Sequence, residues 1–152
     1  MKIIALLIVA TISLYGLGQD LNRKEVIQLI GQTDKLILQG VDLTGLELNQ
    51  LYFIGANLKH TTLIGANLEN TNLNDAELQM GNLERVTLEG ANLSNASLEG
   101  ANLMGANLLR ADFTNTNMEG ANLQFAKFDK GILKAKNLDK ARNFLEDKII
   151  EE

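Results

Sequence analysis

The sequence predicts an all-β solenoid, and three observations support this fold class. A large apolar residue recurs at every fifth position from Leu38 to Leu138. The residue two places before it is small. From Ala56 to Gly131 this position holds Ala, Thr or Gly in every five-residue unit, or cell, except the one that contains Val86. The second residue after it is most often Gly, with Asn or Asp at several other positions. Short extended segments joined by tight turns into a closed coil account for all three observations.

A period of five fits neither an α-helix, which repeats at about 3.6 residues, nor a continuous strand, which repeats at about two. The large residue and the small residue two places before it do face the same side of an extended segment. Since two does not divide five, the chain must turn a corner in every five-residue cell. Stacked coils then allow each peptide to pair with the coils above and below. We expect the large residues, with Leu133 and Leu138 as the last two, to fill the axis of the stack.

The corner residue is the third position of a turn that begins at the large residue. A type II turn requires a positive φ there, which favours Gly and then Asn. We therefore expect left-handed corners at the Gly, Asn and Asp positions. Five corners end in other residues and predict a different turn type: His60, Met80, Arg85, Arg110 and Phe125.

The cells also resemble a known family. The runs GANLENTNLNDAEL and ANLSNASLEGANLMGANLLRADFTNTNMEGANL are similar to the pentapeptide-repeat family, whose cell is A-(N/D)-L-x-x. The resemblance extends from Leu36 to about Gly131. It implies a right-handed, quadrilateral parallel β-helix with four cells per coil, and therefore about five coils over residues 36–135. In such a coil Phe53 and Phe113 share one wall.

Both ends of the repeat carry sequences that predict caps, because an open stack would expose apolar core and unpaired edges. In residues 19–35, Asn22 and Glu25 have the spacing of a capping box, and Val26, Leu29 and Ile30 form an apolar helical stripe. These features predict a short N-terminal cap helix at about 21–32. Protected ends favour a monomer over end-to-end stacking.

Residues 136–152 predict a C-terminal cap and tail. Lys136 occupies a position that holds a small residue in the repeat, so the core should end there. Leu138, Ala141, Leu145 and Ile149 follow at helical spacing, which predicts a cap helix over 138–150.

The N-terminal segment resembles a secretory signal peptide. Residues 3–17 carry no charge, follow Lys2, and are shorter than the roughly 20 residues of a membrane span. Gly16 and Gly18 provide small residues for a cut before Gln19. We therefore interpret residues 1–18 as a signal peptide, with an uncleaved anchor or a buried element of the fold as alternatives. Removal of this segment would leave no stable membrane anchor.

Composition excludes several kinds of chemistry. The chain has no Cys, and its single histidine, His60, stands at a corner without a nucleophile and acid at catalytic spacing. The outward carboxylates are spread over several walls, so no metal site is predicted. With 14 basic and 19 acidic residues the net charge is −5, which disfavours a nucleic-acid partner. We expect no enzyme activity and no cofactor.

Outward apolar residues are the best indication of a protein partner. In a four-cell coil Ile64, Met104 and Phe125 share one face, and Tyr52 and Ile54 share another. Either group could form a partner surface, be covered by a cap, or be exposed by chance. The outward Asn residues are expected to bond the backbone near the corners.

These observations favour an exported, non-catalytic scaffold or binding module with an unidentified protein partner. The resemblance to small, helix-capped cyanobacterial members implies the periplasm or thylakoid lumen. The alternative is a cytoplasmic, DNA-mimicking rod, since some family members occupy the DNA site of a type II topoisomerase. The modest acidity and the signal-like segment disfavour that alternative.

Overall fold

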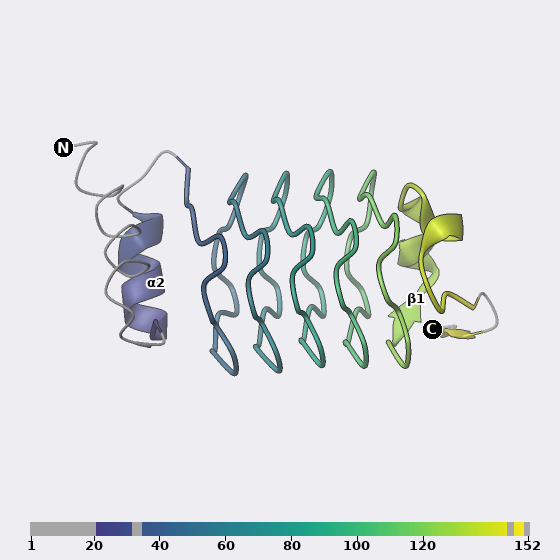
Figure 1. Cartoon of the computed structure of the whole chain (residues 1–152), viewed down its shortest axis with the longest axis horizontal. Helices are drawn as coiled ribbons and strands as arrows, with labels where there is room; N and C mark the ends of the chain where they lie inside the picture. The colour runs from purple at the N-terminus through teal and green to yellow at the C-terminus, as the bar shows by residue number, and fades with distance from the viewer. Residues whose placement is uncertain (1–20, 32–34, 146–147, 151–152) are drawn as a thin grey trace.

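The protein is a rod of stacked coils with a helix across one end, as the computed structural model shows (Figure 1). The structure describes residues 21–31, 35–145 and 148–150, so the signal-like segment 1–18 lies outside the described residues. Within these ranges, no helix has the length and apolar character needed to cross a membrane.

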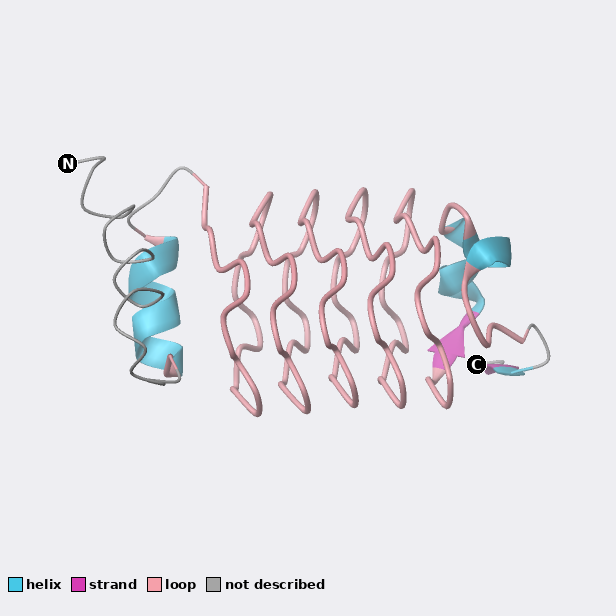
Figure 2. Ribbon diagram, in the orientation of Figure 1, coloured by secondary structure: helices cyan, strands magenta, loops and turns pink. Residues whose placement is uncertain are grey.

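Parallel β-bridges join each coil to the next. They pair residues that are 20 apart, for example Asn72 with Asn92 and Asn82 with Asn102. Backbone hydrogen bonds follow the same register, with Leu93 donating its N–H to the carbonyl of Asp112 at 2.9 Å. A coil therefore contains four cells, as the resemblance implies. Figure 2 draws the coils as loops because each extended segment is too short to count as a strand.

The four cells of a coil give the rod four walls, which we number by their cells. Wall 1 comprises cells 36–40, 56–60, 76–80, 96–100 and 116–120; wall 2 comprises 41–45, 61–65, 81–85, 101–105 and 121–125; wall 3 comprises 46–50, 66–70, 86–90, 106–110 and 126–130; wall 4 comprises 51–55, 71–75, 91–95 and 111–115. Outward side chains of one wall therefore form columns along the rod.

The axis of the rod is filled as the sequence predicts. Every predicted axis residue from Leu38 to Phe128 is buried, and so are the small residues two places before them from Ala56 to Ala121. The buried threonines among the small residues bond their hydroxyls to backbone carbonyls, as Thr61 does to Leu58 at 2.6 Å. Complete burial and satisfied polar groups make the axis a dry, continuous core.

The corners differ from the prediction. The residues at positions 60, 80, 85, 110 and 125 were expected to use another turn type, but all have φ between 55° and 60°, as the Asn and Asp corners do. The reason is that every one of these corners is closed by the same backbone turn bond, as when the Ala126 amide donates to the Leu123 carbonyl at 3.0 Å. At His60, Met80 and Arg85 the corner amide also bonds a carbonyl of the coil above, and this holds the corner whatever side chain it carries.

Helix α2, Arg23–Ile30, covers the first coil and confirms the predicted N-terminal helix. Asn22 Oδ1 accepts from the Glu25 amide at 3.1 Å, and Glu25 Oε2 accepts from the Asn22 amide at 2.9 Å, which is the predicted capping box. Val26 and Leu29 are buried in the same cluster as Leu36. The helix thus closes the apolar end of the stack.

Two polar contacts fasten this cap. Arg23 donates to the backbone carbonyl of Glu47 and to Asn49 Oδ1 at 3.0 Å, which ties α2 to wall 3. Farther along, Glu77 accepts from Lys35 and Lys59, each at 2.6 Å, and so ties the segment before the first coil to wall 1. Hydrogen bonds from Lys35, then Lys59, lower the pKa of Glu77 to about 2.

The C-terminal end leaves the predicted register. The 3-10 helix η1, Lys130–Lys134, places Ile132 in the core and leaves Leu133 49% exposed, so the prediction of Leu133 as an axis residue was wrong. Asp129 Oδ1 caps η1 by accepting from the Gly131 amide at 2.7 Å. This tighter turn shortens the coil by one residue, so that Asn117 pairs with Lys136. Lys136 consequently points outward and is exposed.

The predicted C-terminal helix over 138–150 was also wrong. The segment instead contains the short 3-10 helix η2, Leu138–Lys140, and strand β2, Ile149–Ile150, which pairs in parallel with β1, Phe128–Asp129. The last coil offers open donors and acceptors, such as the Ala121 carbonyl, which accepts from the Arg142 amide at 2.7 Å. An α-helix uses its amides internally, whereas an extended segment can satisfy this edge. Phe144 adds an apolar contact, with its ring centroid 5.7 Å from that of Phe128.

We expect Leu93→Asp to unfold the rod. Leu93 is fully buried, and an unpaired carboxylate on the axis would cost several kcal/mol. Ser94→Asp, on the adjacent outward position, is the matched control and should melt near the parent. Thermal unfolding followed by circular dichroism measures both, and a parent-like melting temperature for Leu93→Asp would refute the inward assignment.

The Glu77 ion pairs predict a pH-dependent contribution to stability. Because the folded-state pKa is lowered, the contribution is present above the usual pKa of 4.5 and is lost as the pH falls towards about 2. Glu77→Gln should therefore unfold more easily than the parent at pH 7, by less than about 1 kcal/mol since these pairs are partly exposed. The two proteins should converge near pH 2 in denaturant titrations. Glu99→Gln, on the same wall, should show no such convergence.

Candidate partner surfaces

Most side chains of the outward Asn column form hydrogen bonds with the backbone. Asn67 Oδ1 accepts from the Glu69 amide at 3.0 Å, and Asn92 Oδ1 accepts from the Ser94 amide at 2.9 Å. The same bond to the amide two residues on occurs at other cells, including those of Asn57, Asn72, Asn82, Asn102, Asn107, Asn117 and Asn122. These bonds shape the corners, in agreement with the structural role expected for these residues.

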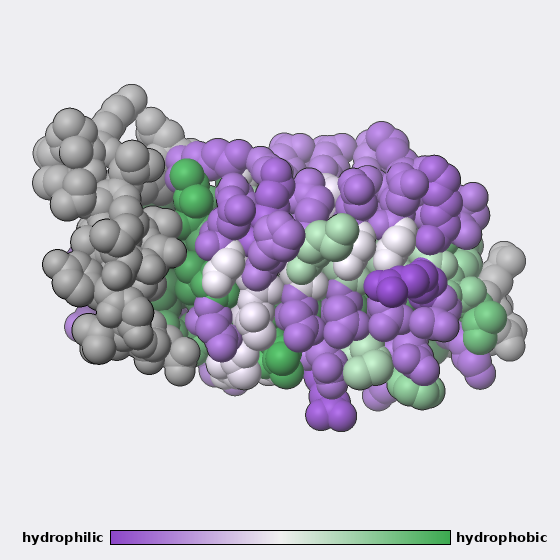
Figure 3. Space-filling model, viewed as in Figure 1, coloured by the Kyte–Doolittle hydropathy of each residue, from purple (hydrophilic) through white to green (hydrophobic). Residues whose placement is uncertain are grey.

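The first predicted patch lies on wall 2. Its column runs through Ile64, Glu84 and Met104, because the Gly65 amide bonds the Glu84 carbonyl and the Arg85 amide bonds the Met104 carbonyl. Ile64 and Met104 are half-buried, whereas Phe125 is 78% exposed. Figure 3 shows one side of the rod, on which hydrophobic side chains are separated by hydrophilic ones. The structure thus places the three residues on one wall but not in one continuous apolar area.

The second predicted patch lies in the first coil of wall 4. Tyr52 is 66% exposed and Ile54 is 53% exposed, on either side of the buried Phe53. Tyr52 pairs with Asn72 of the next coil, so the apolar area ends after one cell. The two patches are therefore on different walls.

Some exposed apolar residues were missed from the sequence. Leu133 was assigned to the axis and Leu145 to a helix, and both are exposed at the C-terminal end. Only the local shift from extended chain to η1 explains the position of Leu133, and the period of five carries no signal for it. Met80 is exposed as its corner position implies, but its side chain lies over the next coil, since a Cβ at Gly100 would be 2.6 Å from Met80 Sδ.

Phe125 is the most exposed of these residues, and like Met80 it has an unfavourable backbone conformation. Its φ is 60°, a left-handed conformation that costs a bulky residue on the order of 1 kcal/mol and that Gly or Asn adopts more easily. Its exposure means that burial recovers little of that cost. Folding alone therefore does not explain a phenylalanine at this corner.

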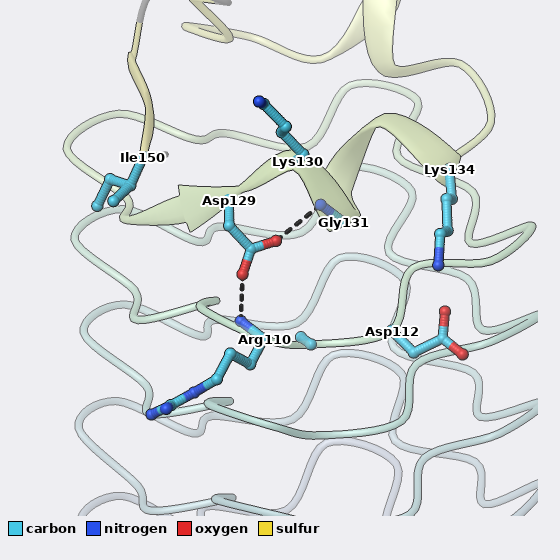
Figure 4. Close-up of a pocket in the computed structure, with 8 residues that line it drawn as sticks. Arg110, Asp112, Asp129, Lys130, Gly131, Lys134 and Ile150 are labelled. Carbon is cyan, nitrogen blue, oxygen red and sulfur yellow. Dashed lines mark hydrogen bonds between the residues drawn. The ribbon is translucent and has the colours of Figure 1, made fainter. Parts of the chain in front are cut away.

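A hollow of about 540 Å³ lies at the C-terminal end, next to β2 (Figure 4). It is lined by polar side chains that include Arg110, Asp112, Asp129 and Lys134. Asp129 accepts from the amides of Arg110 and Gly131, so its carboxylate serves the backbone. Hydrogen bonds from Thr114, with a smaller effect of Lys134, hold the pKa of Asp112 below its usual range. Both carboxylates of the hollow are therefore engaged in bonds within the chain, Asp129 with backbone amides and Asp112 with Thr114.

The described residues hold no group of three or more His, Asp or Glu side chains that could bind a metal ion. His60 is an exposed corner residue, as the sequence predicts. The arrangement of this rod is suited to contact through its outer walls, where side chains are held on a rigid, hydrogen-bonded backbone.

Comparison with protein families agrees with this geometry. A family model described as pentapeptide repeats, with 8 copies, matches residues 37–75, 52–90, 82–120 and 105–134. The chain belongs to the pentapeptide-repeat family. No curated protein matches the sequence.

Two solved pentapeptide-repeat structures are similar over most of this chain. One, from the thylakoid lumen of Arabidopsis thaliana, is 25% identical with a TM-score of 0.62, and the alignment covers 88% of this chain and 80% of that chain. The other, from Nostoc PCC 7120, is 23% identical with a TM-score of 0.66, covering 78% of this chain and 98% of that chain. The pentapeptide-repeat match ends at residue 134, where η1 ends.

We expect Phe125→Asn to stabilise this pentapeptide-repeat rod by about 1 kcal/mol, because Asn tolerates the left-handed corner and the lost side chain is mostly exposed. The free energy of unfolding from denaturant titration measures the gain. Phe125→Leu keeps a bulky side chain at the same φ and should give no comparable gain. Equal gains for both variants would refute the explanation by backbone strain.

Proposed function

We propose that this pentapeptide-repeat protein is an exported, non-catalytic scaffold or protein-binding module. The observation that carries the proposal is Phe125, a strained and exposed aromatic side chain on a wall that also carries Ile64 and Met104. Exposed aromatic side chains are frequent anchors of protein interfaces. Tyr52 and Ile54 form a second, smaller candidate patch.

The proposed compartment is the periplasm or thylakoid lumen. The support is the uncharged segment within residues 1–18, with a cut before Gln19, and the lumenal location of the Arabidopsis relative. The mature protein is proposed to be monomeric, since α2 covers one end of the stack and β2 pairs with the last coil at the other.

The alternative, a DNA-mimicking rod that binds a type II topoisomerase, has weaker support. Such a mimic needs unpaired anionic groups along its surface, as DNA has. Several carboxylates of this rod are instead paired with cations: Glu77 with Lys35 and Lys59, Glu84 with Arg85, Glu89 with Arg110 and Glu119 with Lys140. Inhibition of DNA gyrase supercoiling at micromolar protein would favour this alternative and contradict the proposed role.

Export predicts a defined N-terminus. Mass spectrometry of the protein isolated from its native cells should find a mature chain that begins at Gln19. A chain that retains residues 1–18 and fractionates with the cytoplasm would contradict the proposed export.

The wall 2 surface predicts a selective loss of partner. Affinity capture from the native compartment should recover a protein with the parent that is lost with Phe125→Asn and with the Ile64→Lys, Met104→Lys double variant. Since Phe125→Asn is expected to be more stable than the parent, its loss of partner would not reflect unfolding. Thr87→Lys, on wall 3, is the control and should retain the partner. Equal recovery with all variants would exclude this surface.

A further inference from the structure

Wall 4 differs from the other walls in its chemistry. Apart from Ile54 and Gly55 of the first coil, its outward positions from Tyr52 to Asn115 carry amides, hydroxyls and the carboxylates Asp75 and Asp112, and its cells contain no Lys, Arg or His. Exposed groups of this kind attract neither phosphates nor anionic membranes, which need clustered cations. Its backbone groups bond the neighbouring coils, so no strand edge is open to an added peptide along the wall.

One column of this wall places an aromatic ring in line with polar groups. Tyr52, Asn72, Asn92 and Asp112 are joined in succession by β-bridges, so they lie on consecutive coils. Adjacent coils are spaced at about 4.8 Å, so Tyr52 and Asn92 are about 10 Å apart along the rod. Tyr52 is exposed, and the two Asn side chains are half-buried.

Amide donors remain available in this column. Within the described residues, Asn72 and Asn92 use Oδ1 to accept from backbone amides, and neither Nδ2 has an acceptor. On wall 2, by contrast, Asn102 donates to Asn82 and Asn122 donates to Asn102 in a continuous ladder. On wall 3, Asn67 and Asn107 donate to Glu47 and Glu89. Asn82 on wall 2 and Asn117 on wall 1 each have one Nδ2 without an acceptor among the described residues. Wall 4 differs because it has two such groups on consecutive coils.

One carboxylate acceptor belongs to the same cell as Asn72. Asp75 is the exposed corner residue of the Asn72 cell, and its carboxylate makes no hydrogen bond to another described residue. The wall thus combines an exposed aromatic ring, two free amide donors and a free carboxylate on adjacent coils. Amide donors and carboxylate acceptors match hydroxyl groups, and an aromatic face packs against the apolar face of a pyranose ring.

We propose that wall 4 binds a neutral oligosaccharide that lies along the rod, with one sugar on Tyr52 and its hydroxyls bonded to Asn72, Asn92 and Asp75. This site is independent of the wall 2 surface, because the two lie on different walls. The absence of cations from the cells of wall 4 favours a neutral sugar over an acidic one.

The test is an NMR titration of the full mature chain with cellohexaose, chitohexaose and maltohexaose at millimolar concentration. At least one of these should shift the side-chain amide signals of Asn72 and Asn92, while those of Asn102 and Asn122 on wall 2 stay in place. No shift with any of the three, or equal shifts on all walls, would overturn the proposal.

Substitutions test which residues of wall 4 bind the sugar. Asn92→Asp removes the donor but keeps the acceptor that the Ser94 amide needs, as Asp112 does for Thr114 at 3.0 Å. Asn92→Asp should lower the affinity for the sugar by about tenfold, and Tyr52→Thr should lower this affinity at least as much. Asn102→Asp is the matched control on wall 2 and should bind like the parent. Equal binding by Tyr52→Thr and the parent would also overturn the proposal, as would a protein partner that the sugar does not displace and whose capture requires Tyr52.

Discussion

The hydrogen bonds between coils determine most other features of this rod. They join residues 20 apart, so that four cells close one coil and every outward position becomes part of a column. They also hold left-handed corners where no Gly is present, such as those of Met80 and Arg85. The axis residues fill the interior, but the bonds determine the direction in which each side chain points. The same bonds leave open groups at the last coil, and residues of the C-terminal segment such as Lys136 and Arg142 satisfy them.

Much of this fold could be predicted from the sequence because the repeat is a direct record of its geometry. The axis residues up to Phe128 and the capping box of Asn22 and Glu25 depend on local spacing, and both are confirmed. The C-terminal end could not be predicted in the same way. Leu138, Leu145 and Ile149 fit a helical period, but the unpaired edge of the last coil, which no local pattern encodes, decides their conformation.

The candidate surfaces could be predicted only in part. A period of five places Ile64 and Met104 on one wall, but it does not show that both are half-buried or that Met80 leans over Gly100. It likewise cannot distinguish Asn102, which donates to the next coil, from Asn92, whose donor remains available. These differences depend on which side chains face each other across coils.

A rod of this kind separates stability from recognition. The axis and corner residues hold the backbone, while the outward positions can change with little effect on the core. Two walls use this freedom in different ways. Wall 2 carries the exposed Phe125 and the half-buried Ile64 and Met104, and wall 4 aligns Tyr52 with free amides. Both surfaces exist only if the coils are in the register described.

That register can be measured directly in solution through scalar couplings across backbone hydrogen bonds. The amide nitrogen of Leu93 should couple to the carbonyl carbon of Asp112, and that of Asn92 to the carbonyl carbon of Thr71. Couplings to these partners, repeated along the rod, are the predicted result. Couplings that join other pairs of residues, or amides at these positions that exchange freely with water, would contradict it.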